Sequence, residues 1–190
     1  DKTLQILIAA ASVIFAFFAA SSGTFQWENF LLFTNASLFG VSDPVFHKDI
    51  GFYIFQLPFL KHVYGWLFFV LMFTMVATGM MYFIRRAFSF IPPRTWRISP
   101  QARMHISVLV AILFFWGTFG AWLELNEILF AKRGVVFGPG YTEVTTQLWV
   151  LKSLMIVTVL CGISIICYAF RPDWRVPAAA VSVFFLIIIF

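Results

Sequence analysis

Acidic and histidine side chains gather in one polar stretch of an otherwise apolar sequence. Asp43, His47 and Asp49 lie close together in the chain, and Glu143 follows much later. Imidazole nitrogen and carboxylate oxygen are ligands that zinc accepts, and carboxylates alone suit calcium. On a helix Asp43 and His47 would share a face and Asp49 would point elsewhere, so another ligand must come from a different segment. Asp43, His47, Asp49 and Glu143 therefore form a candidate metal site.

The same residues also fit structural roles. Ser42-Asp43-Pro44 is typical of a helix start, where Asp caps free N–H groups and Pro fits the first turn. Asp49 would then pair with a cation, and His47 would lie at the surface. The sequence contains no nucleophile elbow, P-loop, HExxH or CxxC motif. It predicts no catalytic residue and no cofactor beyond a metal ion, and it leaves open whether the protein is an enzyme.

Lys152 is a charged residue set inside an apolar run. A charge within a membrane span is a candidate functional group, for example on an ion or substrate path. Its long side chain can also reach outward to water, or pair with Glu124 or Glu127 at the end of the preceding run. Both interpretations remain open.

The composition indicates which solvent surrounds these residues. Of the 190 residues, 62% are hydrophobic and only 11% are charged. A soluble domain has about 25% charged residues. Such a chain has more apolar surface than its own core can bury, so the lipid bilayer is its expected partner.

Five apolar runs predict membrane spans and an all-α polytopic membrane protein, a helical bundle with helices lying in the outer interface. The predicted spans are residues 4–20, 63–84, 104–123, 148–169 and 176–190. Segments 21–62 and 124–147 lie between them on one side of the membrane. The last run is short for a span and the chain begins with Asp1, so we expect a fragment of a longer protein.

Lysine and arginine are distributed unequally between the two sides. The N-terminus and the linkers after residues 84 and 169 carry eight Lys/Arg and two acids; the opposite segments carry four and six. Cytoplasmic loops are enriched in Lys and Arg. The N-terminus is therefore expected in the cytoplasm, and segments 21–62 and 124–147 outside it. Because the net charge of +5 reflects topology, no nucleic-acid partner is predicted.

Residues 39–59, FGVSDPVFHKDIGFYIFQLPF, are too polar to span a bilayer and too apolar for an ordinary loop. Helical spacing predicts an interfacial helix from Pro44, and Gly51 is expected to allow a bend or a close contact. Residues 25–33 are a companion interfacial segment. Candidate docking residues on this side are aromatic or apolar, namely Trp27, Phe46, Ile50, Phe52, Tyr53, Phe55 and Tyr141.

Two motifs resemble a known family. The stretch above is similar to the FG..DP.F..D..FY.F.LPF signature of the bacterial uncharacterised protein family 0182. RGVVFGPGYTEV resembles its RG..FG.GYTDV block, with Glu143 in place of Asp. The resemblance covers about residues 27–170. It implies a multi-pass protein of the bacterial inner membrane, with about seven N-terminal spans and a long extracytoplasmic region, and it implies no mechanism.

Three functions follow as hypotheses. The first is a non-enzymatic scaffold, assembly or docking component, whose aromatic outer segments bind membrane or extracytoplasmic polypeptides. The second is a transporter or channel component, which requires a polar path involving Lys152. The third is a metal-dependent membrane enzyme of the outer face, which requires its acids to converge.

Overall fold

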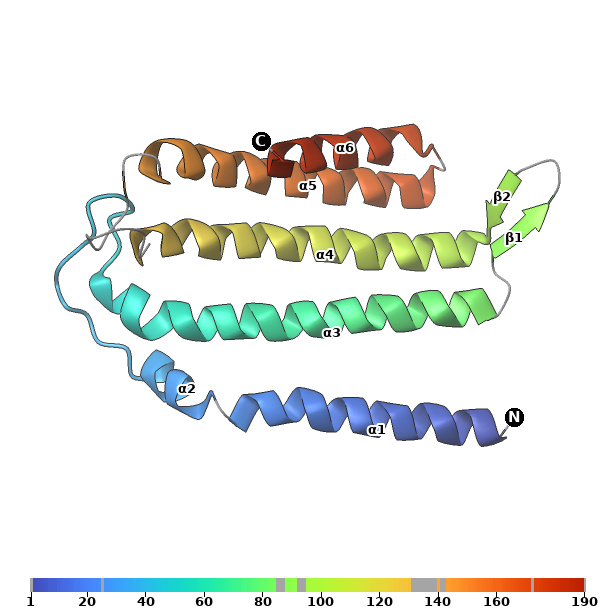
Figure 1. The fold of residues 1–190 in the computed structure, drawn as a ribbon, viewed down its shortest axis with the longest axis horizontal. Coiled ribbons are helices and arrows are strands. Elements are labelled where there is room, and N and C mark those ends of the chain that lie inside the picture. Colours follow the sequence, from blue (N-terminus) through green and yellow to red (C-terminus); the bar gives the residue numbers. More distant parts are fainter. Residues whose placement is uncertain are drawn as a thin grey trace. The chain divides into compact units, whose positions relative to one another are not determined.

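Each of the five apolar runs forms an α-helix (Figure 1). The structure is a computed structural model that describes residues 2–24, 26–84, 88–91, 95–130, 140, 143–171 and 173–189. The helices on the runs are α1 (Lys2–Thr24), α3 (Leu57–Ile84), α4 (Pro100–Glu127), α5 (Leu148–Phe170) and α6 (Arg175–Ile189). In a bilayer every backbone group needs a partner within the protein, and a helix provides one within the segment. The predicted all-α fold class is confirmed.

Among the residues that the structure describes, three helical stretches are long and apolar enough to cross a bilayer. They are Phe52–Ile84, Pro100–Glu127 and Thr145–Phe170, with 33, 28 and 26 residues. A crossing needs about 20 residues. The apolar helices Gln5–Ser21 and Arg175–Ile189 are shorter, so their role as spans stays a prediction.

The chain divides into two compact units, residues 1–66 and 67–190, with the boundary inside α3. The first unit contains α1, the short helix α2 (Trp27–Thr34), a π-helical turn η1 (Phe52–Gln56) and the start of α3. The Trp66 indole N–H donates to the Ala19 carbonyl over 2.9 Å and joins α3 to α1. The Phe33 and Phe59 rings, 4.8 Å apart, join α2 to α3.

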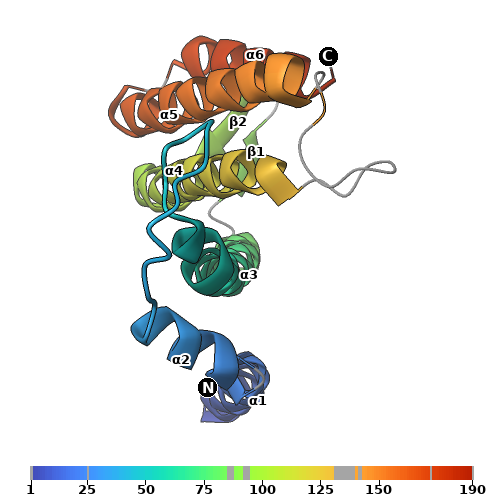
Figure 2. The same ribbon diagram turned by 90° about the vertical axis from the view of Figure 1, so that its left-hand side faces the viewer.

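In the second unit α4, α5 and α6 lie side by side (Figures 1 and 2). Gly162 of α5 lies close to α4, since an added Cβ there would meet the Phe115 ring at 2.9 Å. Small side chains let membrane helices approach closely. The Thr118 and Thr158 hydroxyls form a hydrogen bond of 2.9 Å between the two helices. A 3₁₀ turn (Ile128–Phe130) follows α4, and a π-helical turn η3 (Glu143–Gln147) leads into α5.

A β-hairpin in the arginine-rich linker was not predicted. Strands β1 (Phe88–Ile91) and β2 (Thr95–Ile98) pair antiparallel, with Phe88 opposite Ile98 and Ile91 opposite Thr95. Both segments contain the aromatic and β-branched residues that favour strands. The strand pattern was missed because both segments are short and lie among arginines and prolines.

The predicted helix start at Pro44 is wrong. Residues 44–46 form a turn, and the helix begins at Ile50. Ser42 and Asp49 form an isolated antiparallel bridge, and His47 has a left-handed φ of 56°. A left-handed residue ends any helical path, so Asp43 caps a turn rather than a helix.

Thr158→Val tests the hydroxyl contact between α4 and α5. The substitution removes an interhelical hydrogen bond, which in membrane proteins contributes on average about 0.6 kcal/mol. We expect a small fall in the thermal unfolding midpoint in detergent. Thr74→Val is the matched control, because the exposed Thr74 hydroxyl donates only to Val70 O of its own helix. Equal midpoints for the two variants would contradict a role for the interhelical bond.

Candidate functional site

The Asp43 carboxylate organises the turn that follows it. Its Oδ1 accepts the backbone N–H groups of Val45 and Phe46, each over 2.7 Å. Its Oδ2 accepts the Lys48 N–H over 3.0 Å and the Tyr53 hydroxyl over 2.7 Å. Asp43 is only 9% exposed. A buried carboxylate needs such partners, and here four donors supply them.

Asp49 organises the segment of the loop that precedes Asp43. Its Oδ1 accepts the N–H groups of Phe39 and Gly51, over 3.0 and 2.7 Å, and its Oδ2 accepts the Gly40 N–H over 2.9 Å. Gly40 has a positive φ of 72°, which glycine tolerates without strain. The two acids thus tie residues 38–51 into one unit, which we name the carboxylate loop.

The charge state of both acids follows from these contacts. Burial alone would raise the pKa of Asp43, but the donors Phe46, Tyr53, Lys48 and Val45 together hold its pKa below the usual range. The N–H groups of Phe39 and Gly51, and then of Gly40, lower the pKa of Asp49. Both acids are therefore ionised at neutral pH.

Two side chains fasten the loop to the start of the following helix. Tyr53, only 5% exposed, brings its hydroxyl to Asp43 from η1. The Lys48 ammonium lies 4.1 Å from the centroid of the Phe52 ring, a cation–π contact. The rings of Phe39 and Phe55 stack 5.8 Å apart. The loop is thus held at both ends by η1.

Gly51 lies where the chain passes close to itself, as predicted. An added Cβ would collide with the Ser37 carbonyl oxygen and approach Asp49 Oδ1 to 3.0 Å. The φ of Gly51 is −56°, so the requirement is for space rather than for an unusual backbone angle. The carboxylate loop leaves no room for a side chain here.

Exposed apolar side chains lie on the carboxylate loop and beside it. Leu38, Phe39, Val41 and Ile54 are 85%, 53%, 56% and 45% exposed. We name these four residues the apolar rim. Sequence periodicity did not single them out, because three of them precede the predicted helix and their exposure depends on how the loop folds. An exposed apolar group on an ordered loop is typical of a binding surface.

The predicted docking residues are divided between interior and surface. Tyr53 is buried, Trp27 is 63% exposed, and the others that the structure describes are half-buried, namely Phe46, Ile50, Phe52 and Phe55. Tyr141 lies outside the described residues. The candidate docking surface is therefore the apolar rim rather than the predicted helical stripe.

The metal-site residues are not brought together by the described part of the chain. His47 is exposed, and Asp43 and Asp49 are bonded to N–H donors. Glu143 begins η3, but its side chain lies outside the described part. Among the residues that the structure describes, no three His, Cys, Asp or Glu side chains are placed to hold an ion. The metal site stays a prediction.

Lys152 lies near the start of α5 and is exposed. Its ammonium lies 5.9 Å from the centroid of the Trp149 ring, and Trp149 is itself 71% exposed. An ammonium over an aromatic ring at a helix end suits a side chain that reaches toward the membrane surface. The predicted pairing with Glu124 or Glu127 stays a prediction.

Comparison with known proteins agrees with the motifs. The model of the uncharacterised protein family UPF0182 matches residues 1–190. The chain belongs to this family. It is 35% identical to a UPF0182 protein of Trichlorobacter lovleyi over 92% of this chain and 19% of the relative. It is 33% identical to one of Geobacter sulfurreducens, with the same two shares.

The chain therefore spans about a fifth of the length of these UPF0182 relatives, which have 19% of their length covered. A UPF0182 protein of Thermobifida fusca is 29% identical over 90% of this chain and 17% of the relative. No solved structure matches the chain. The family membership and the long apolar helices are shown, and the activity is a matter for proposal.

Gly51→Ala tests the close approach in the carboxylate loop. Because the added methyl collides with a backbone carbonyl, we expect a destabilisation of about 1–3 kcal/mol, measured as a lower thermal midpoint. Faster amide exchange at Phe39 and Gly40 should accompany it. Gly65→Ala is the control, because an added Cβ there meets nothing within 4 Å. The same response in both variants would contradict the prediction.

Acid should open the carboxylate loop. Both carboxyl pKa values are lower in the folded chain than in the unfolded one. Their stabilisation is therefore present above about pH 5 and is lost as the pH falls below about 4, through the lowered pKa values. Pepsin should cleave residues 38–51 more readily near the lower pH, after correction with an unfolded peptide of that sequence.

An Asp43→Asn/Asp49→Asn double variant provides the control for the acid experiment. It lacks both titrating groups, so its loop should be cleaved readily at either pH. A wild-type loop whose corrected cleavage does not depend on pH would contradict the assignment of the two acids.

Proposed function

We propose that this segment is a docking component of a membrane complex, in which the carboxylate loop presents the apolar rim to a polypeptide outside the membrane. The observation that carries the proposal is the combination of strong ties and exposed apolar side chains. Two carboxylates fix the backbone of the loop, yet Leu38 remains 85% exposed. A preordered loop loses little conformational entropy on binding.

The proposed topology places the loop on the outer face. The N-terminus lies in the cytoplasm, segments 21–62 and 124–147 lie outside it, and the protein resides in the bacterial inner membrane. Support comes from the excess of Lys and Arg on the opposite side. The partner is an extracytoplasmic polypeptide, either a separate subunit or another region of the longer family protein.

Transport receives less support from the described residues. Three hydroxyls of α4 and α5 already have partners, since Thr118 bonds to Thr158 and Ser164 donates to the Cys161 carbonyl over 2.8 Å. Hydroxyls that are already hydrogen-bonded are poor ligands for a passing ion. Lys152 is exposed and lies near the start of α5 rather than deep between helices.

A metal-dependent enzyme is likewise less supported, because both acids already accept the hydrogen bonds that hold the carboxylate loop. An ion bound at Asp43 would have to displace the backbone N–H donors of Val45, Phe46 and Lys48. The acids act as backbone acceptors, and the exposed apolar rim beside them suits binding rather than chemistry.

Photo-crosslinking tests docking in the full-length protein in native membranes. A benzoylphenylalanine at Val41 should form adducts with polypeptide, identified by mass spectrometry. Leu38→Glu in the same chain should lower the adduct yield several-fold, because a charge at a buried interface is costly. His47→Glu is the matched control on an exposed position of the same loop and should leave the yield unchanged.

Two results would contradict docking. Adducts with lipid alone would place the apolar rim against the bilayer. A yield that Leu38→Glu and His47→Glu change equally would show that the rim does not select the partner.

A further inference from the structure

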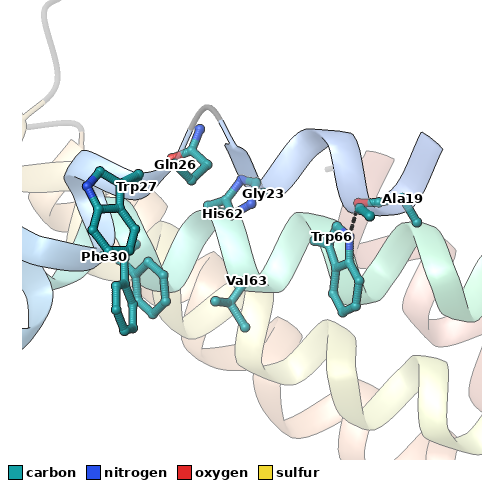
Figure 3. A pocket seen from close by; sticks show the side chains of 10 residues that line it. Ala19, Gly23, Gln26, Trp27, Phe30, His62, Val63 and Trp66 are labelled. Carbon is teal, nitrogen blue, oxygen red and sulfur yellow. Dashed lines mark hydrogen bonds between the residues drawn. The ribbon is translucent and has the colours of Figure 1, made fainter. Parts of the chain in front are cut away.

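The first unit contains an open pocket of about 340 Å³ between α1, α2 and the start of α3 (Figure 3). Small residues of α1 form one wall, namely Ala19, Ala20 and Gly23. Trp27 and Phe30 stand on one side, and Trp66 stands on the other. The volume lies in the range of small-molecule sites, about 300–1,000 Å³.

The walls of the pocket are fixed by contacts within the unit. Trp66 donates its indole N–H to Ala19 O, so its ring cannot swing away without losing that bond. The Phe30 ring packs against Phe59, with centroids 5.7 Å apart, and against Trp27, with centroids 6.1 Å apart. The pocket is therefore formed before any ligand arrives.

The polar groups in the lining are few. His62 lies between the two aromatic sides, next to Val63 on α3, and Gln26 lies at the turn between α1 and α2 (Figure 3). The Gln26 side-chain oxygen accepts from the Asn29 amide over 2.6 Å, which fixes the orientation of that amide. A ligand for this pocket is thus apolar over most of its length and has one polar end.

We propose that the pocket binds one acyl chain of a phospholipid, with the polar end of the molecule at His62 and Gln26. The surface around it is apolar, since Phe17 and Phe18 of α1 are 72% and 67% exposed. Such a surface suits hydrocarbon rather than water and α1 is predicted as a span, so lipid is the molecule expected at the mouth of the pocket.

The lining suits a hydrocarbon chain, because it is apolar apart from His62 and Gln26 and small residues form one wall. A flexible hydrocarbon chain can follow the groove that the small α1 residues leave open. The proposal does not depend on the apolar rim, which consists of other residues.

Native mass spectrometry of the full-length protein tests the proposal. The protein is stripped of lipid in mild detergent and titrated with phosphatidylglycerol. We expect one tightly bound lipid in the wild type. Gly23→Leu and Ala20→Leu place extra methyl groups in the pocket and should each weaken that binding roughly tenfold or more, since each displaced methylene contact contributes to affinity.

Gly79→Leu is the matched control. An added Cβ at Gly79 also meets nothing within 4 Å, but this residue is not part of the pocket lining. It should bind lipid as the wild type does. Size-exclusion chromatography identifies variants that fail to fold. If one of the two filling variants does not fold, the other still tests the pocket.

His62→Ala provides a test that leaves the apolar walls intact. If the polar end lies at His62, phosphatidylglycerol should lose several-fold in affinity, while diacylglycerol, which lacks the phosphate, should lose less. Equal losses for the two lipids would overturn the placement of the polar end.

Two further outcomes would overturn the proposal as a whole. One is wild-type lipid retention in both filling variants. The other is a photoreactive residue at Ala20 that captures polypeptide rather than lipid in native membranes. Neither result bears on the crosslinks formed at Val41, so failure here and failure of docking are distinguishable.

Discussion

The hydrogen bonds from backbone N–H groups to two carboxylates are the constraint on which the outer part of this chain depends. Residues 38–49 form neither a helix nor a full strand ladder, so many N–H groups of the carboxylate loop need acceptors from side chains. Asp43 and Asp49 supply seven such bonds between them when the Tyr53 hydroxyl is included. Short side chains suit this role because they reach only nearby backbone.

The membrane helices are held by a different kind of force. Lipid is as apolar as leucine, so apolar burial does not drive α4 against α5. Their contact includes the close approach of Gly162 to the Phe115 ring and the Thr118–Thr158 hydrogen bond. Charged acceptors hold the carboxylate loop, and close packing holds the helix pair. Acid should therefore open the loop and leave the helix pair in place.

Sequence patterns predicted what local composition determines. The apolar runs specified the helices, the two motifs specified the family, and Gly51 was recognised as a close contact. The helix start was missed because Asp43-Pro44 fits both a helix N-terminus and a tight turn. The choice depends on Tyr53 and on the reach of Asp49 back to Phe39, which are contacts between residues ten apart. Local pattern does not contain them.

The pocket and the apolar rim were invisible for the same reason, since each arises from where several segments meet. The acids illustrate how this changes a functional argument. As a bare pattern, Asp43, His47 and Asp49 suggest a metal site. In the folded loop an incoming ion would have to displace N–H donors, several of them half-buried, and each donor left unpaired would cost free energy. A site that must first break its own scaffold binds an ion weakly, which favours reading these acids as the support for a docking surface.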